Sequence, residues 1–192
     1  ELKAGKANIK VIGVGGMGCN AITWLYNKGI NGATVFAANT DAFHLSVSKS
    51  DDKILIGKEL TRGLGCGGMP QRGREAAKEA IVDLKKAVAN ADMVFVIAGM
   101  GGGTGTGAAP VIAQLAKETG AVVIGVVTMP FEAERARVDK AEFGLQELRE
   151  MSNTCIVLDN NRLVDIAGQL PIEQAFAVAN ELVSTMIKDI VE

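Results

Sequence analysis

The stretch GGGTGTG at Gly101–Gly107 lies between an apolar run, MVFVIA at Met93–Ala98, and a helical pattern that starts at Ala108. Clustered glycine indicates that the backbone comes close to another group or adopts φ/ψ angles that other residues avoid. Several amide N–H groups of such a loop can converge on one concavity suited to anionic oxygen, and the hydroxyls of Thr104 and Thr106 add donors. This stretch therefore predicts a phosphate site between a buried strand and a helix.

A second glycine cluster, GVGGMG at Gly13–Gly18, satisfies GxGxxG, ends the apolar run Ile9–Val14 and opens a helix. Amides at a helix N-terminus bind phosphate well, so this cluster favours a nucleotide. A dinucleotide site stays open, because Asn39-Thr40-Asp41 stands where an acid would hold the ribose. A dinucleotide fold does not need a second phosphate loop after its fourth strand, whereas a nucleoside triphosphate does. A P-loop is excluded, because the sequence contains no GxxxxGK[ST].

Strand and helix patterns alternate along the chain, which predicts an α/β fold: a doubly wound, mostly parallel sheet of about six strands, Rossmann-like, with helices on both faces. Strands are expected at 9–14, 34–38, 53–56, 93–98, 121–128 and 154–158, and helices at 20–27, 73–89, 108–119, 135–150 and from 171 onward. Residues 15–18, 99–107 and 159–162 are expected to be turns or loops. A third glycine cluster lies at 63–68, and all three clusters are expected at the carboxyl ends of the strands, where such folds bind ligands.

Composition narrows the function classes. The net charge is −2 and no basic run stands out, so nothing in the charge pattern favours a nucleic-acid partner. No apolar stretch approaches the roughly 18 residues of a membrane span, and no membrane insertion is expected. Cys19, Cys66 and Cys155 are widely spaced and odd in number, which predicts free thiols in a reducing cytoplasm and no metal site. His44 is the only histidine, and a surface or packing role is expected for it.

These motifs resemble the FtsZ family of the tubulin superfamily. GGGTGTG is similar to the glycine-rich signature that FtsZ and the tubulins share, and further matches cover almost the whole chain in order: Ile12–Ala21 (IGVGGMGCNA), Ala38–Ala42 (ANTDA), Gly63–Pro70 (GLGCGGMP) and Thr128–Phe131 (TMPF). The stretches Glu134–Arg137 (ERAR) and Leu158–Arg162 (LDNNR) resemble archaeal members more than bacterial ones. The resemblance implies GTP or GDP as the ligand, with Mg²⁺ accompanying the triphosphate.

The resemblance also implies a role for each matching residue. The phosphates would lie along Gly15, Gly16, Met17, Gly18 and Asn20 and in a cradle of Gly102, Gly103, Thr104, Gly105 and Thr106. Asn39 and Asp41 would approach the sugar and α-phosphate, Cys66, Gly67 and Gly68 would cover the γ-phosphate, and Glu134 and Arg137 would hold the ribose and nearby phosphate. Asn160, Phe176 and Asn180 would bind and stack on guanine.

Three departures from the family pattern bear on these roles. Met17 and Cys19 replace glycines that are common in the first loop of the family. Contacts through the backbone amides are still possible at these positions if φ stays negative. Arg135 competes with Arg137, because Glu and Arg usually stand four apart in the family and Glu134 and Arg137 are three apart. Asn180 stands where many members have Asp; its amide oxygen can still accept from guanine, without the charge.

The resemblance sets the expected organisation and activity. Residues 1–170 are expected to form the GTP-binding domain, and residues 171–192 a central helix leading to a second domain that is absent from this chain. A cytoplasmic protein at the division site is implied, which polymerises head to tail with itself and meets cell-division accessory proteins. In the family an acidic loop of the neighbouring subunit completes hydrolysis. No catalytic residue is therefore expected in this chain, which should bind GTP but hydrolyse it poorly.

Two alternatives remain. One is an NAD(P)-binding domain of an oxidoreductase, which Gly13–Gly18 supports and Gly101–Gly107 opposes. The other is a structural member of the tubulin superfamily that assembles without hydrolysing nucleotide.

Overall fold

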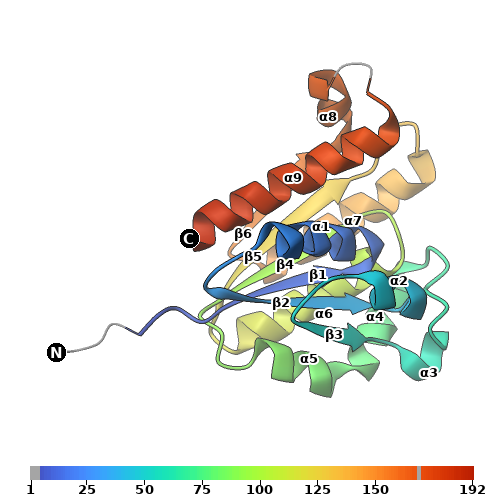
Figure 1. Cartoon of the computed structure of the whole chain (residues 1–192). Helices are drawn as coiled ribbons and strands as arrows, with labels where there is room; N and C mark the ends of the chain where they lie inside the picture. The colour runs from blue at the N-terminus through green and yellow to red at the C-terminus, as the bar shows by residue number, and fades with distance from the viewer. Residues whose placement is uncertain (1–4, 168–169) are drawn as a thin grey trace.

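A computed structural model describes residues 5–167 and 170–192, and it contains one six-stranded sheet in which every pairing is parallel. The strand order is β3-β2-β1-β4-β5-β6 (Figure 1). The strands are β1 (Ile9–Val14), β2 (Ala33–Asn39), β3 (Asp52–Leu55), β4 (Met93–Gly99), β5 (Val122–Met129) and β6 (Thr154–Asp159). The predicted doubly wound α/β sheet is confirmed, and each expected strand lies within two residues of its observed bounds.

Helices cover both faces of the sheet, because successive side chains of each strand point to opposite sides. The helices are α1 (Gly15–Lys28), α2 (Ala42–Val47), α3 (Lys58–Thr61), α4 (Pro70–Glu79), α5 (Ile81–Val88), α6 (Thr104–Glu118), α7 (Arg135–Met151), α8 (Asn160–Ala167) and α9 (Ile172–Val191). In β1, Ile12 and Val14 face the core under α4, α5, α6 and α7, whereas Val11 faces the core under α1 and α9. Both faces of the strands are therefore apolar, as the continuous apolar runs predicted. Among the described helices, none is both long enough and apolar enough to span a membrane.

The strand order places a crevice at one edge of the sheet. β1 and β4 are neighbours, with Val14 opposite Ala98, so these strands end at the same level. The chain after β1 continues toward β2, and the chain after β4 continues toward β5 on the other side. Because the loops after β1 and β4 run in opposite directions, they leave a crevice at the carboxyl ends of these strands. Doubly wound sheets bind ligands at such a crevice.

Two glycine-rich stretches that were expected to be loops form the first turns of helices. α1 begins at Gly15, five residues before the expected start, and α6 begins at Thr104 instead of Ala108. Gly15 has a φ of 75°, which lets the chain pass from strand to helix without an intervening loop. A Cβ on Gly18 would overlap the carbonyl oxygen of Ile97, so the glycine allows α1 to lie directly against β4.

Two further expectations were wrong in detail. The helix predicted at 73–89 is divided at Ala80, whose φ and ψ of −93° and 19° end α4 before α5 begins; nothing in the sequence indicates this break. The predicted polar turn at 159–162 is instead the start of α8. Asp159 Oδ1 accepts the backbone N–H of Asn161 at 2.9 Å, and residues typical of turns are also the best residues for beginning a helix.

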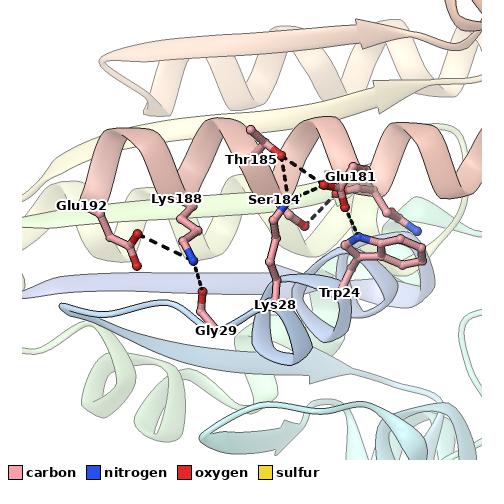
Figure 2. A network of polar contacts seen from close by, with 9 residues as sticks. Trp24, Lys28, Gly29, Glu181, Ser184, Thr185, Lys188 and Glu192 are labelled. Carbon is pink, nitrogen blue, oxygen red and sulfur yellow. Dashed lines mark hydrogen bonds and ion pairs between the residues drawn. The ribbon is translucent and has the colours of Figure 1, made fainter.

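The two helices on the second face, α1 and α9, are joined by apolar packing and by a polar network. Ile22 and Leu25 of α1 and Val183 and Ile187 of α9 belong to one buried cluster. At the surface, Glu181 of α9 accepts from the indole Nε1 of Trp24 at 2.5 Å and from the Lys28 ammonium (Figure 2). The outer side of α9 leaves Leu182 and Ile190 about half exposed.

Candidate nucleotide site

One cavity of about 510 Å³ lies at the carboxyl edge of the sheet, and the starts of α1 and α6 both open onto it. Its lining includes Gly15, Gly16 and Met17 from α1 and the segment 102–105 leading into α6. The first N–H groups of a helix lack partners within the helix and carry the positive end of its dipole. Two such ends on one cavity suit a ligand with several anionic groups.

Side-chain contacts join three separate segments that line this cavity. Thr40, after β2, has its Oγ1 2.7 Å from Oγ1 of Thr104 in the first turn of α6. The Cys66 thiol lies 3.5 Å from the first hydroxyl and 3.4 Å from the second. Gly65, Cys66 and Gly68 all line the cavity, so the third glycine cluster reaches the same site.

Asn39 and Asp41 line the side of the cavity nearest β2. Oδ1 of Asn39 accepts the backbone N–H groups of Thr40 and Asp41 at 2.8 and 3.3 Å, which fixes the orientation of its amide. Its Nδ2 is buried and has no hydrogen-bond partner among the described residues. Asp41 caps α2, because its Oδ1 accepts the backbone N–H of His44 at 2.9 Å.

The start of α7, which follows the loop after β5, supplies an acid and a cation. Glu134 and Arg137 both line the cavity and form an ion pair with 3.5 Å between Oε1 and Nη1. Oε2 of Glu134 also accepts the backbone N–H of Phe131 at 3.2 Å. Arg137, not Arg135, is among the lining residues, which favours Arg137 for the role that the spacing left open.

The opposite end of the cavity is formed by Asn160 and Phe176, on α8 and α9. Asn160 is buried, and its Oδ1 has no hydrogen-bond partner among the described residues. The Phe176 ring is half-buried and packs edge-on against Phe131, with 6.2 Å between ring centroids. An unpaired acceptor beside an aromatic ring suits a planar base that carries N–H donors.

Five of the expected residues do not line the cavity, namely Gly18, Asn20, Gly67, Thr106 and Asn180. Gly18 lies against β4, and Asn20 is exposed on α1 with its Oδ1 2.8 Å from the His44 ring. Thr106 is buried and accepts the backbone N–H of Gly101 at 2.9 Å, so it shapes the loop instead of facing the cavity.

Other lining residues were not expected, and the most informative is His44. Thr40 and the segment 128–130 also line the cavity. His44 stands three residues after Asp41 in a short helix, and that spacing is the signal that could have placed it at the site.

The residues that depart from the family's first loop fit the backbone that they occupy. Arg62 and Asn90 are the non-glycine residues with positive φ in the described part of the chain, so Met17 and Cys19 keep the negative φ that contact through their amides requires. Cys19 is buried, and burial raises the pKa of its thiol to about 12. Cys19, Cys66 and Cys155 are all free thiols in the structure.

Comparison with known proteins gives the family. The model of the Tubulin/FtsZ family, GTPase domain, matches residues 8–168. Cell division protein FtsZ 2 of Methanocaldococcus jannaschii is 53% identical over 188 residues, which cover 98% of this chain and 50% of that protein. The chain therefore spans about half the length of the curated relatives it matches.

Two solved structures share the fold. An empty FtsZ dimer from M. jannaschii matches with a TM-score of 0.95 and 48% identity, covering 100% of this chain and 56% of that one. CetZ1 from Haloferax volcanii, a GDP-bound monomer, matches with a TM-score of 0.82 and 26% identity, covering 93% of this chain and 58% of that one.

Proposed function

Because the chain belongs to the Tubulin/FtsZ family, whose GTPase domain it matches, we propose that its cavity binds a guanine nucleotide. The phosphates lie on the starts of α1 and α6, and the base lies between Phe176 and Asn160. The GDP-bound state of CetZ1, which has the same fold, supports this proposal.

The observation that carries the proposal is a pair of buried polar atoms without partners. Asn39 Nδ2 and Asn160 Oδ1 belong to residues that line the same cavity, and neither atom has a hydrogen-bond partner among the described residues. A buried polar group without a partner costs about 1–3 kcal/mol, so such atoms usually meet a ligand or water. The Asn39 Nδ2 donor on the β2 side matches a sugar-phosphate at one end of the ligand. The Asn160 Oδ1 acceptor near Phe176 matches the N1–H and N2–H₂ donors of guanine at the other end.

The test is calorimetric titration of the chain with GTP, ATP and NAD in the presence of Mg²⁺. Tight binding of GTP with weak binding of ATP and none of NAD is expected. Asn160→Ala should remove most of the preference for GTP over ATP. Asn161→Ala is the matched control, because this neighbour directs its Oδ1 to the backbone N–H of Glu132, outside the cavity lining. Binding of NAD, or equal binding of GTP and ATP by the unmodified chain, would contradict the proposal.

We further propose that the whole protein is a filament-forming GTPase of cell division, located in the cytoplasm at the division site, whose copies associate head to tail and meet accessory proteins. Acidic residues from the next copy complete hydrolysis. The acids of this cavity support that division of labour, because Asp41 is engaged as the cap of α2 and Glu134 is engaged with Arg137 and the Phe131 amide. Mg²⁺ would enter with the triphosphate, whose oxygens are the hard ligands it prefers.

The hydrolysis proposal is tested by measuring GTP turnover of this chain over a wide range of protein concentrations. Slow turnover per molecule that does not rise with concentration is expected. Turnover that rises steeply with concentration would show that this chain alone completes the active site, and would contradict the proposal.

A further inference from the structure

The His44 ring lies across the first turn of α1. Its Nε2 is 2.8 Å from Oδ1 of Asn20, and a Cβ added to Gly16 would lie 3.3 Å from its Cε1 and 3.4 Å from its Nδ1. The ring therefore bridges α2 and α1, with its Cε1–Nδ1 edge toward the backbone that opens the phosphate side of the cavity. His44 is partly buried and lines that cavity.

The contact with Asn20 assigns the protons of the ring. An amide oxygen only accepts hydrogen bonds, so Nε2 of His44 is the donor. In the neutral ring Nδ1 is then an acceptor, which faces the first turn of α1 and repels a phosphate oxygen. When the ring takes up a proton, Nδ1 becomes a second donor and the ring becomes a cation. Histidine is the side chain whose ordinary titration falls between about pH 5 and 8.

The charged and titratable groups near the His44 ring are already paired or neutral, so they do not prevent its protonation. On α1, Cys19 precedes Asn20 in sequence, and burial raises the pKa of its thiol to about 12, so the thiol is neutral in this range. Asp41 caps α2, the helix that carries His44, and Lys53 of β3 donates to the Ser46 carbonyl at the other end of α2. Across the cavity, Glu134 and Arg137 are paired with each other.

We propose that His44 is a proton-dependent contact for the phosphates of the bound nucleotide, held in place by Asn20. The proposal rests on the nucleotide site proposed above and adds a residue to it. An imidazolium beside phosphate oxygens makes a charge-assisted hydrogen bond, which is roughly twice as strong as a neutral one. Binding and protonation are therefore linked: the nucleotide favours the charged ring, and acid conditions favour the nucleotide.

The first experiment uses the fact that His44 is the only histidine in the chain. Its Cε1–H signal is followed by NMR from about pH 5 to about pH 8.5, the range in which histidine titrates, with and without saturating GDP and Mg²⁺. The midpoint of the titration is expected to move to higher pH when GDP is bound. A midpoint that is the same in the two samples overturns the proposal, and this measurement needs no variant.

The second experiment measures the Kd for GDP at about pH 6 and about pH 8, on either side of the ordinary histidine titration. The unmodified chain is expected to bind about tenfold more tightly at the lower pH, the change that a charge-assisted contact of moderate strength gives. His44→Gln retains an N–H donor for Asn20 but takes up no proton, so its affinity should follow only the titration of the nucleotide itself. Phe43→Ala, an exposed neighbour on the same helix, should keep the pH dependence of the unmodified chain.

The outcomes distinguish a failure of the proposed role of His44 from a failure of the proposed nucleotide site. If GDP binds at the higher pH and the unmodified chain and His44→Gln have the same pH profile, the role of His44 is wrong and the nucleotide site stands. If GDP binds at neither pH, the proposed site fails and the role of His44 fails with it.

Discussion

The helix pairs on the two faces of the sheet are joined in different ways. Between α4 and α6 the contact is backbone against backbone: a Cβ on Gly107 would overlap the Pro70 carbonyl, and one on Gly73 would overlap the Gly103 carbonyl. On the other face, α1 and α9 meet through branched side chains and through the exposed network around Glu181 (Figure 2). Backbone contacts of the first kind tolerate no displacement, whereas side chains of the second kind can change rotamer.

This difference separates the two ends of the candidate site. The start of α6, which we propose as the phosphate cradle, is part of this close backbone contact. Phe176, at the other end, is carried by α9, which is held by side chains. We infer that the phosphate end is rigid and that the base end can adjust, and four variants test this contrast.

Gly107→Ala should have the largest effect. The added methyl group has no space beside Pro70, so α4 and α6 must move apart, and the free energy of unfolding should fall by about 3 kcal/mol or more. Urea unfolding followed by circular dichroism measures this. A loss smaller than about 1 kcal/mol would mean that the two helices are not locked at this point.

Gly102→Ala should affect binding and not stability. Gly102 lines the same cavity, but a Cβ there meets nothing within 4 Å. The unfolding midpoint should therefore match that of the unmodified chain, while the methyl group beside the cradle should weaken GDP binding by about tenfold, or about 1.4 kcal/mol. Unchanged affinity in calorimetry would indicate that this part of the loop lies away from the ligand.

Ile187→Val tests the side-chain face. Ile187 is fully buried between α9 and its neighbours, and removing one methyl group should lower the free energy of unfolding by about 1 kcal/mol. Leu182→Val, on the exposed side of α9, is the matched control and should change it much less. Equal effects of the two substitutions would contradict the packing of α9 described above.

Glu181→Gln should have the smallest effect, and the effect should depend on pH. Hydrogen bonds from Lys28, and then from Trp24, hold the pKa of the Glu181 carboxyl below its ordinary value. A lowered pKa means that the carboxylate adds stability above the ordinary glutamate pKa of about 4.3, and that this stability is lost as the pH falls through the folded-state value. Thermal unfolding should therefore show a small deficit of the variant at neutral pH that disappears in acid. Glu150→Gln, which also removes an exposed acid, here on α7, is the matched control for the loss of a surface charge.

Most of the strands were predictable because each is largely an apolar run, whereas β3 (DKIL) contributes only Ile54 and Leu55 to such a run. The starts of α1 and α6 were missed because glycine has low helix propensity, which favours a loop at Gly15–Gly18 and around Gly105. Tertiary contact overrides propensity here, since only glycine allows a helix to begin against a strand at Gly18. The start of α8 was missed for a related reason, because the same polar residues favour turns and helix caps.

The candidate site was predictable where loops follow strands, since the carboxyl ends of parallel strands meet at one edge. Residue-level roles were harder. Thr106 carries a hydroxyl in the right loop, yet its direction is set by the Gly101 amide. The ring of His44 has no hydrogen-bond partner close by in sequence, because it contacts Asn20 of α1, 24 residues before it. The roles given to Asn160, Phe176 and Asn180 stay predictions.

Trp24 is the only tryptophan of the chain, and its indole N–H joins α1 to Glu181 of α9. The indole of Trp24 is already exposed, so the emission of this one chromophore reports on the separation of the two helices through the loss of its hydrogen bond to Glu181. No label has to be attached, and Trp24→Phe supplies a dark background for the same measurement. Tryptophan fluorescence can therefore follow the position of α9, the helix that carries Phe176, during a ligand titration.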